Sequence, residues 1–346
     1  MVSPAPTTAN GHPPASKPLL EIRGLKMHFP VKGGVLMRAQ KQCKAVDGVD
    51  LHVNEGETLG LVGESGCGKS TLGKCVVRLN KITGGQVTFD GTDITQLGRS
   101  ALKPYRKDIQ MIFQDPAESL NPRHTIGNLL AEPFIIHGLL SAKERDIKVA
   151  ELLEKVGLQA SAADRFPFEF SGGQRQRIGI ARAIALNPRL IVCDEPVSAL
   201  DVSVQSQILN LLVDLQREMR LSYIFIAHNL AVVKHISDRI AVMYLGKIVE
   251  LAPADELFAN PLHAYTKALI SAIPEPVPGG GRAQRILLQG DVPSPIDPPE
   301  GCAFAYRSWL PTSDDQKRQP GTFREVTPGH WVELHPGTVE DYEKYL

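Results

Sequence analysis

Residues 57–71 read ETLGLVGESGCGKST, an apolar run followed by a glycine-rich turn. The apolar part, 57–62, predicts a buried strand, and a helix is expected from Lys69 to about Leu79. Residues 63–70 fit the phosphate-loop pattern G-x-x-x-x-G-K-[ST] without deviation. Glycines allow the N–H groups of such a loop to turn inward and bind phosphate at a helix N-terminus. The stretch therefore predicts a nucleoside-triphosphate site, and its flanking strand and helix disfavour a chance glycine turn.

Each residue of this loop is a candidate ligand of the nucleotide. Lys69 is expected to reach the β- and γ-phosphates, the Ser70 hydroxyl to bind Mg²⁺, and the Thr71 hydroxyl to add a phosphate contact. The candidate nucleotide-binding residues of the loop are Gly63, Glu64, Ser65, Gly66, Cys67, Gly68, Lys69, Ser70 and Thr71.

A second apolar run, LIVCDE at 190–195, ends in two adjacent carboxylates. Buried carboxylates are costly to desolvate unless they meet a cation or take part in proton transfer. We expect Asp194 to hold Mg²⁺ and Glu195 to polarise the attacking water as the general base. Such a strand end alone would more often be a helix N-cap, but its combination with the phosphate loop favours catalysis.

The order of predicted elements places both motifs in an α/β domain. Helices are expected at about 173–186 and 204–219, and strands at 190–193 and 223–227. Strands that alternate with helices imply a largely parallel sheet.

Three other regions depart from this pattern. Short strands, interrupted by a loop at 30–34, are expected between Leu19 and about Val53. Helical spacing at 142–156, with Gly157 as a stop, favours a helical insertion. Beyond Ile273 the sequence becomes rich in Pro and Gly, which favours loops.

The predicted organisation has three parts. A disordered tail at 1–17 is rich in Pro, Ala, Ser and Thr. A nucleotide-binding domain follows at 18–275, with a mostly parallel sheet, an antiparallel β region and a helical subdomain at about 115–170. A loop-rich C-terminal extension is expected at 276–346.

Composition argues against several classes. The 346 residues include 38 Lys+Arg and 38 Asp+Glu, so no global basic field points to nucleic acid, while a local basic patch stays open. No run approaches the ~18 apolar residues that span a bilayer, and the N-terminus lacks the pattern of a secretory signal. The five cysteines are odd in number, scattered and without a CxxC pair, which favours neither a disulfide framework nor a zinc site. A reducing cytoplasm fits this usage.

The stretch FSGGQRQR at 170–177 predicts a second helix N-terminus with free N–H donors. One ATP does not need two anion sites from distant parts of one chain. The economical interpretation is that this helix end addresses the nucleotide held by another subunit.

This stretch resembles the signature motif of ATP-binding-cassette (ABC) proteins, with Phe170 where leucine is usual, and the resemblance covers most of the chain. It implies a P-loop NTPase core whose two ATP sites are each shared between two subunits. The implied contacts to the partner's ATP come from Ser171, Gly172, Gly173 and Gln174.

Three further positions match motifs of the same family. Gln114 resembles the Q-loop glutamine, which touches Mg²⁺ and the attacking water. Asp201, in SALD at 198–201, resembles the D-loop that crosses the dimer interface. His228 resembles the switch histidine at the γ-phosphate, although a lone histidine after a strand is usually structural.

Two positions are less typical. Asn229 follows the histidine where the family usually has aspartate, which is expected to loosen a local hydrogen bond. For adenine stacking, which the family assigns to an aromatic residue near the first strand, Phe29 is the candidate, with His28 adjacent. Core packing explains Phe29 equally well.

Several stretches resemble the oligopeptide/dipeptide/nickel importer subfamily, and most closely the second of its two paralogous ATPase subunits. They are MIFQDPAESLNPR at 111–123, PVSALDVSVQSQIL at 196–209, MYLGKIVE at 243–250, NPLHAYT at 260–266 and GDVPSP at 290–295. The resemblance implies a paralogous or identical ATPase partner, two membrane permeases and an extracytoplasmic binding protein. It places the chain peripherally on the cytoplasmic face of the membrane, with peptides as leading cargo and nickel or another solute as the alternative.

The segment 115–132 is expected to form the groove that receives a permease helix, with a helix-stabilising surface loop as the alternative. Family members often carry several cysteines after the Gly-Cys pair, which is Gly301-Cys302 here, and such a set can provide the thiolates of an iron–sulfur cluster. Here only Cys302 remains, with Ser308 at the next aligned position. One thiolate cannot support a four-thiolate cluster, so ATP and Mg²⁺ are the only cofactors expected.

Two other functions compete with transport. A soluble cassette ATPase acting on ribosomes or DNA usually has two cassettes or a long coiled-coil insertion, whereas this chain has one cassette and no sustained heptads. A structural subunit with a dead site would need a degraded motif, and none is found here.

Overall fold

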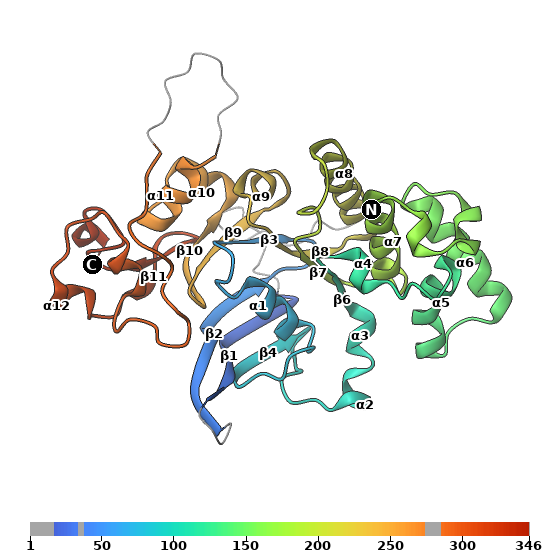
Figure 1. Cartoon of the computed structure of the whole chain (residues 1–346), viewed down its shortest axis with the longest axis horizontal. Helices are drawn as coiled ribbons and strands as arrows, with labels where there is room; N and C mark the ends of the chain where they lie inside the picture. The colour runs from blue at the N-terminus through green and yellow to red at the C-terminus, as the bar shows by residue number, and fades with distance from the viewer. Residues whose placement is uncertain (1–16, 34–37, 274–284, 346) are drawn as a thin grey trace, which may run out of the picture.

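Two β-sheets form the centre of the structure, a computed structural model that describes residues 17–33, 38–273 and 285–345. The larger sheet has the strand order β11-β12-β10-β9-β3-β8-β7-β6, and the smaller has the order β2-β1-β4-β5. Helices cover the larger sheet, and the smaller sheet lies beside α1, as Figure 1 shows. This agrees with the expected α/β class.

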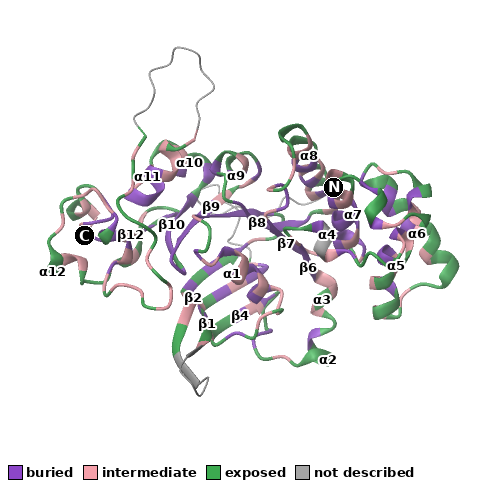
Figure 2. Ribbon diagram, viewed as in Figure 1, coloured by how far each residue is buried: buried purple, intermediate pink, exposed green. Residues whose placement is uncertain are grey.

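The parallel part of the larger sheet carries both chemical motifs. Its strands, in spatial order, are β9 (Arg239–Tyr244), β3 (Thr58–Val62), β8 (Ser222–Ile226), β7 (Leu190–Asp194) and β6 (Ile109–Ile112). Every residue of β3, β7 and β8 is buried, as Figure 2 shows in purple for the centre of the sheet. Continuous apolar strands are typical of parallel sheets covered on both faces. Parallel strands all end at one edge, where ligands bind in open α/β sheets.

Helices follow the strands in the order expected of a parallel sheet. The first three major helices of the core are α1 (Lys69–Val76), α7 (Gly172–Ile184) and α8 (Val202–Met219). The last three are α9 (Leu230–Ile236), α10 (Ala254–Ala259) and α11 (Ala264–Ser271). Helix α1 is shorter than expected, because Arg78 takes a left-handed conformation with φ 57°.

The N-terminal strands are longer than the sequence predicts. β1 (Leu20–Gly33) and β2 (Arg38–Val53) form one antiparallel hairpin arm, so the expected loop at 30–34 is wrong for Pro30–Gly33, while Gly34 lies outside the described residues. β1 pairs with β4 (Gly84–Phe89) only as far as Lys26. Beyond that residue β1 has β2 as its neighbour, and proline is tolerated in a strand with one free edge. The short strand β5 (Thr92–Asp93) completes this sheet.

A helical subdomain is inserted between β6 and β7. Its helices are α4 (Pro116–Ser119), α5 (Ile126–His137), α6 (Ala142–Lys155), η1 (Ala160–Asp164) and η2 (Pro167–Glu169). Local sequence fixes their starts: the Ser141 N–H donates to the Glu144 carboxylate at 2.6 Å, which is half of a capping box. Between β5 and β6 lie the short helices α2 (Arg99–Leu102) and α3 (Tyr105–Asp108).

The C-terminal region is more ordered than its composition predicts. Residues 285–302 contain no helix or strand, but η3 (Ala303–Tyr306), α12 (Asp314–Lys317) and η4 (Tyr342–Tyr345) follow. β11 (Thr322–Thr327) and β12 (His330–Leu334) form a hairpin, and β12 pairs with β10 (Lys247–Pro253). The region therefore extends the larger sheet. Of the predicted N-terminal tail 1–17, only Lys17 is described, and the boundary at 276 is also outside the described residues.

A buried carboxylate fastens the C-terminal hairpin to the cassette. Glu250 is 0% exposed and accepts the Leu262 and His263 N–H groups at 2.8 and 3.1 Å. His330 Nε2 lies 2.8 Å from the same carboxylate. One residue of β10 thereby holds both the turn before α11 and the first residue of β12.

Replacing Glu250 by Ala is expected to cost about 3 kcal/mol of stability, because several buried polar groups lose their partner at once. Urea unfolding of the purified chain measures this free energy. Glu256→Ala is the matched control, since this carboxylate is half-exposed and 3.8 Å from the other nitrogen of His330. Equal losses in the two variants would contradict the anchoring role of Glu250.

No helix in the described part of the chain is long and apolar enough to cross a bilayer.

Candidate nucleotide-binding and hydrolysis site

The phosphate loop lies between β3 and α1, as predicted. Gly63 has φ 152° and Gly68 has φ 109°. A Cβ atom on Gly63 would lie 2.1 Å from the Met243 carbonyl oxygen, and one on Gly68 would lie 2.0 Å from that of Ala45. These two positions therefore require glycine, because the loop passes directly against neighbouring backbone.

Lys69 lies inside the loop. The residue is 4% exposed, and its ammonium donates to the carbonyl oxygens of Gly63 at 2.8 Å and Glu64 at 3.0 Å. The Cys67 sulfur is 3.7 Å away, and burial raises the pKa of this thiol. A buried ammonium at a helix N-terminus gives the loop the positive character that a phosphate chain needs.

A hydroxyl and a carboxylate meet across the site in the arrangement that the sequence predicts. The Ser70 hydroxyl donates to Asp194 Oδ1 at 2.6 Å, which joins α1 to the end of β7. Burial raises the pKa of Asp194, and the Ser70 hydrogen bond opposes that shift. A desolvated carboxylate gains from a cation beside it, and hard oxygen donors of this kind fit Mg²⁺.

Magnesium commonly takes its remaining ligands from phosphate and water. The described residues contain no group of three or more His, Cys, Asp or Glu side chains that could hold a metal ion by themselves.

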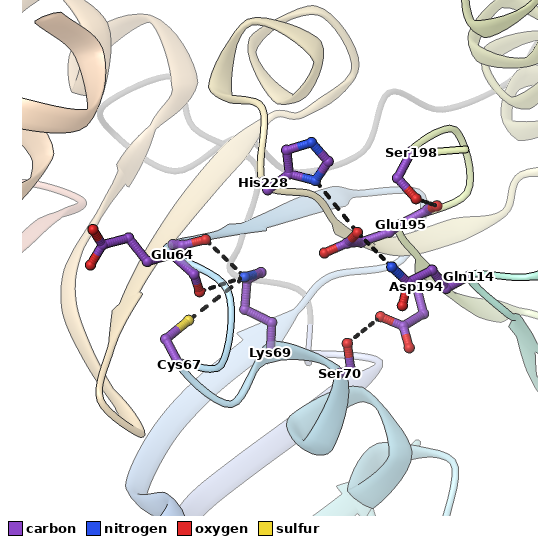
Figure 3. Close-up of polar contacts among 10 residues, drawn as sticks. Glu64, Cys67, Lys69, Ser70, Gln114, Asp194, Glu195, Ser198 and His228 are labelled. Atoms are coloured by element: carbon purple, nitrogen blue, oxygen red, sulfur yellow. Dashed lines mark hydrogen bonds and ion pairs between the residues drawn. The ribbon is translucent and has the colours of Figure 1, made fainter. Parts of the chain in front are cut away.

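Three side chains from separate strand ends converge beyond Asp194 (Figure 3). Gln114 Nε2 donates to Glu195 Oε2 at 2.9 Å, and His228 Nδ1 lies 3.4 Å from the same oxygen. The Glu195 side chain is 15% exposed, whereas that of His228 is 58% exposed. A partly shielded carboxylate held by an amide and an imidazole has the arrangement of a general base that can take a proton from water.

The backbone at Glu195 is held in an unusual conformation. Its φ is 46°, in the left-handed region that residues other than glycine seldom adopt. Its N–H donates to the Ile226 carbonyl at 3.0 Å, and its own carbonyl accepts from the Ser198 hydroxyl at 3.1 Å. Neighbouring structure thus fixes this conformation, which is frequent at functional sites.

A cleft of about 1180 Å³ opens beside these side chains. Asp194, Glu195, Gln114 and His228 are among the residues that line it. Residues of α5 and α7 line it too, among them Glu132, Pro133, Ile136 and Arg182.

The signature-like helix end is well formed but lies outside this cleft. The Ser171 hydroxyl accepts from the Gln174 N–H at 3.3 Å, and Gln174 Oε1 accepts from the Ser171 N–H at 3.0 Å. Ser171 is exposed, and residues 171–174 are not among those that line the cleft. A Cβ on Gly173 would meet Val204 Cγ1 at 2.5 Å, so this glycine allows α7 to pack on α8.

Two other predicted residues lie at the surface. Asp201 is exposed at the start of α8, next to Val202, whose side chain is 79% exposed. Phe29 is 37% exposed on the hairpin β1–β2, so burial in the core does not explain it. Nε2 of its neighbour His28 lies within hydrogen-bond distance of Asp47 Oδ1, at 2.9 Å.

Asn229 makes a local hydrogen bond at the start of α9. Its side-chain oxygen accepts the Ala231 N–H at 2.9 Å and caps α9. An asparagine oxygen is as good an N-cap acceptor as an aspartate oxygen.

Sequence reasoning missed two contacts to the phosphate loop. Tyr265 and Arg307 both bond to Glu64, from helix α11 and from the C-terminal region. Tyr265 lies within the NPLHAYT stretch that resembles the importer subfamily, whereas Arg307 lies in none of the quoted stretches.

Cys302 is buried, and its thiol lies 3.8 Å from Glu333 Oε2. Burial raises the pKa of this thiol. The expectation of no iron–sulfur cluster stays a prediction.

Known protein families and solved structures resemble this chain in sequence and in fold. Residues 46–198 match the family described as ABC transporter, and residues 249–313 match the family described as oligopeptide/dipeptide transporter, C-terminal region. The chain is similar to a solved dimeric ATP-binding cassette in a post-hydrolysis state bound to ADP and Pi, with a TM-score of 0.61 and 30% identity, covering 68% of this chain and 98% of that one. The fold and the site thus define an ATP-binding cassette, an ATPase of the ABC class.

The curated relatives of this chain show to which family within the ABC class it belongs. The chain is 53% identical to the oligopeptide transport ATP-binding protein AppF of Bacillus subtilis over 319 residues, 92% of this chain and 97% of that protein. It is 55% identical to OppF of Salmonella typhimurium, a protein with the same description, over 90% of this chain and 95% of that protein. The chain therefore belongs to the family of ATP-binding subunits of oligopeptide and dipeptide ABC transporters.

Proposed function

We propose that this chain hydrolyses ATP to power a membrane importer of di- and oligopeptides. The observation that carries the proposal is the convergence of Gln114, Glu195 and His228 beside the phosphate loop. Cargo is inferred from relatives above 50% identity that are named as oligopeptide transport ATP-binding proteins. A cassette for nickel or another small solute is the alternative, and a soluble non-transport cassette is less favoured.

The proposed chemistry assigns each side chain one task. The loop's N–H groups and Lys69 would hold the β- and γ-phosphates, and Ser70, Asp194 and Gln114 would hold Mg²⁺. When bound, the metal would supply positive charge to the transferred phosphoryl group. Glu195 takes a proton from the attacking water, and His228 contacts the γ-phosphate, which yields ADP and phosphate. Phe29 is proposed to stack on adenine, because its ring is exposed on the hairpin whose strand β2 contacts the loop at Ala45.

The other half of each site is proposed to come from a second ATPase subunit. Residues 171–174 of that neighbour would present N–H groups and a positive helix end to the phosphates. The exposure of Ser171 and Asp201 leaves both residues accessible to a neighbouring subunit, which supports this assignment. A paralogue is the favoured partner, and a second copy of this chain is the alternative.

The part of the cleft that α5 lines is proposed to receive a cytoplasmic helix of a permease. Ile136 of α5 is 58% exposed and lies in the cleft with Glu132 and Arg182. An apolar groove with charged edges suits an amphipathic helix. Because Gln114 lines the same cleft, movement of the helical subdomain would link ATP hydrolysis to the permease. We therefore propose that the chain lies on the cytoplasmic face of the membrane and that a binding protein serves the opposite face.

Transport by the complete assembly tests the proposed function. A complex purified through a tag on this chain is expected to contain two permeases and a second ATPase, and in proteoliposomes to take up labelled peptide only with ATP and binding protein. Glu195→Gln in this chain should reduce uptake towards the level without ATP. Uptake of radioactive nickel but not peptide would contradict the cargo, and a tagged chain that co-purifies with ribosomes instead of permeases would contradict transport.

A further inference from the structure

The second residue of the phosphate loop is bonded to the distant C-terminal region. Arg307 donates to Glu64 through both terminal nitrogens, Nη1 to Oε2 at 2.7 Å and Nη2 to Oε1 at 3.3 Å. The arginine side chain is 8% exposed and that of the glutamate is 31% exposed. Two parallel bonds from a planar guanidinium fix a carboxylate in orientation as well as in charge.

A second contact holds the same loop residue through its backbone. The Glu64 N–H donates to the hydroxyl of Tyr265 at 2.7 Å, and Tyr265 is 0% exposed. Its ring packs against those of Tyr244 and Phe304, with centroids 4.9 and 5.5 Å away. Phe304 lies in η3, three residues before Arg307. The same aromatic cluster therefore packs against Tyr265 and fixes the segment that carries Arg307.

The bonds from Arg307 bring a positive charge against the Glu64 carboxylate and fix the direction in which it points. The Glu64 carboxylate points away from Lys69 in Figure 3, while its carbonyl accepts from the Lys69 ammonium at 3.0 Å. A carboxylate at the mouth of an anion site opposes the binding of a polyphosphate, and partial burial makes that repulsion larger than in bulk water. Burial by itself would lower the pKa of Arg307, but the bonded Glu64 carboxylate acts in the opposite direction and the pKa is raised overall, so the arginine stays charged.

We propose that Arg307 is a positioning residue for the nucleotide site: it neutralises Glu64 and holds it away from the phosphates, so that nucleotide affinity depends on the docked C-terminal region. The inference rests on the nucleotide site of the proposed function and is independent of the cargo. Arg307 touches neither nucleotide nor metal, and acts through Glu64.

Binding of MgADP, which is not hydrolysed, tests this inference by calorimetry on the purified full chain. Arg307→Gln is expected to raise the Kd about fivefold, because the Glu64 charge is left unneutralised. Glu64→Gln is expected to lower the Kd below the wild-type value, since the carboxylate is removed and the cation remains. The double variant should return towards the wild-type Kd. Arg307→Lys should give a Kd between those of the wild type and Arg307→Gln, because lysine keeps the charge but not the two parallel bonds.

The pattern of these variants separates neutralisation from simple anchoring. If Arg307 only anchored the C-terminal region, Glu64→Gln would weaken binding and the double variant would bind as weakly as Arg307→Gln, which would overturn the proposal. Glu64→Gln decides the matter even if Arg307→Gln does not fold. Arg318→Gln is the matched control, because this arginine of the same region is 65% exposed and is expected to leave the Kd unchanged. Failure of the wild-type chain to bind MgADP would refute the nucleotide site itself.

Discussion

Replacement of Glu195 by Gln is expected to lower ATP turnover by a factor of about 10²–10⁴ while nucleotide binding is retained. The Glu195 carboxylate accepts a hydrogen bond from Gln114 Nε2 at 2.9 Å and lies 3.4 Å from His228 Nδ1. These contacts fix its orientation before water binds. A glutamine at 195 keeps nearly the same shape but cannot accept a proton. ATP would then bind and close the dimer without being cleaved, and the trapped dimer would be visible by size-exclusion chromatography.

Phosphate release measures the turnover, and calorimetry measures the binding. Glu218→Gln is the matched control, since Glu218 is an exposed carboxylate that pairs with Lys155 on the surface. It should leave both quantities unchanged. Turnover at the wild-type rate in the Glu195 variant would remove this residue from its assigned role.

Local sequence patterns predicted the parts of the site that depend on local geometry. The loop at 63–70 and the strand end at Asp194 lie where the sequence places them, because a glycine turn before a helix and a buried strand are both set by neighbouring residues. Their meeting, with Ser70 bonded to Asp194 over 124 positions, follows from the parallel order of β3, β8 and β7. The convergence of Gln114 and His228 on Glu195 was expected only by resemblance.

The features that sequence reasoning missed depend on contacts between distant segments. β6, β9 and β10 were not predicted from periodicity, since short apolar strands give a weak signal. β11 and β12 were not predicted, because the composition around them is rich in Pro and Gly and no residue of β11 is buried. The Arg307–Glu64 pair joins residues 243 positions apart, and only the folded C-terminal region places the guanidinium beside the loop.

The second large effect is expected at Ser171, although this residue lies outside the cleft. Ser171→Arg should lower turnover roughly a hundredfold, as removal of a positioned donor to a transition-state anion does. Loss of the N-cap itself costs only about 1 kcal/mol, so folding is not at risk. Ser141→Arg is the matched control, because Ser141 is the equally exposed N-cap of α6 and its N–H is held by Glu144 as that of Ser171 is held by Gln174. It should keep full turnover.

Mixing two inactive variants shows whether Ser171 serves its own nucleotide or that of a neighbour. Lys69→Ala removes a phosphate ligand of the variant's own loop but leaves its Ser171 intact. If sites are shared, a mixed dimer of this variant with Ser171→Arg has one site with both parts intact and one with neither. Random pairing of equal amounts makes half the dimers mixed, so turnover should recover to roughly a quarter of the wild-type value. If this chain pairs with a paralogue, Ser171→Arg here and the lysine change in the partner's loop should disable the same site and be no worse together than singly. Full-speed hydrolysis by a monomeric Ser171→Arg chain would contradict the shared site, because the helix end would then have no nucleotide to serve.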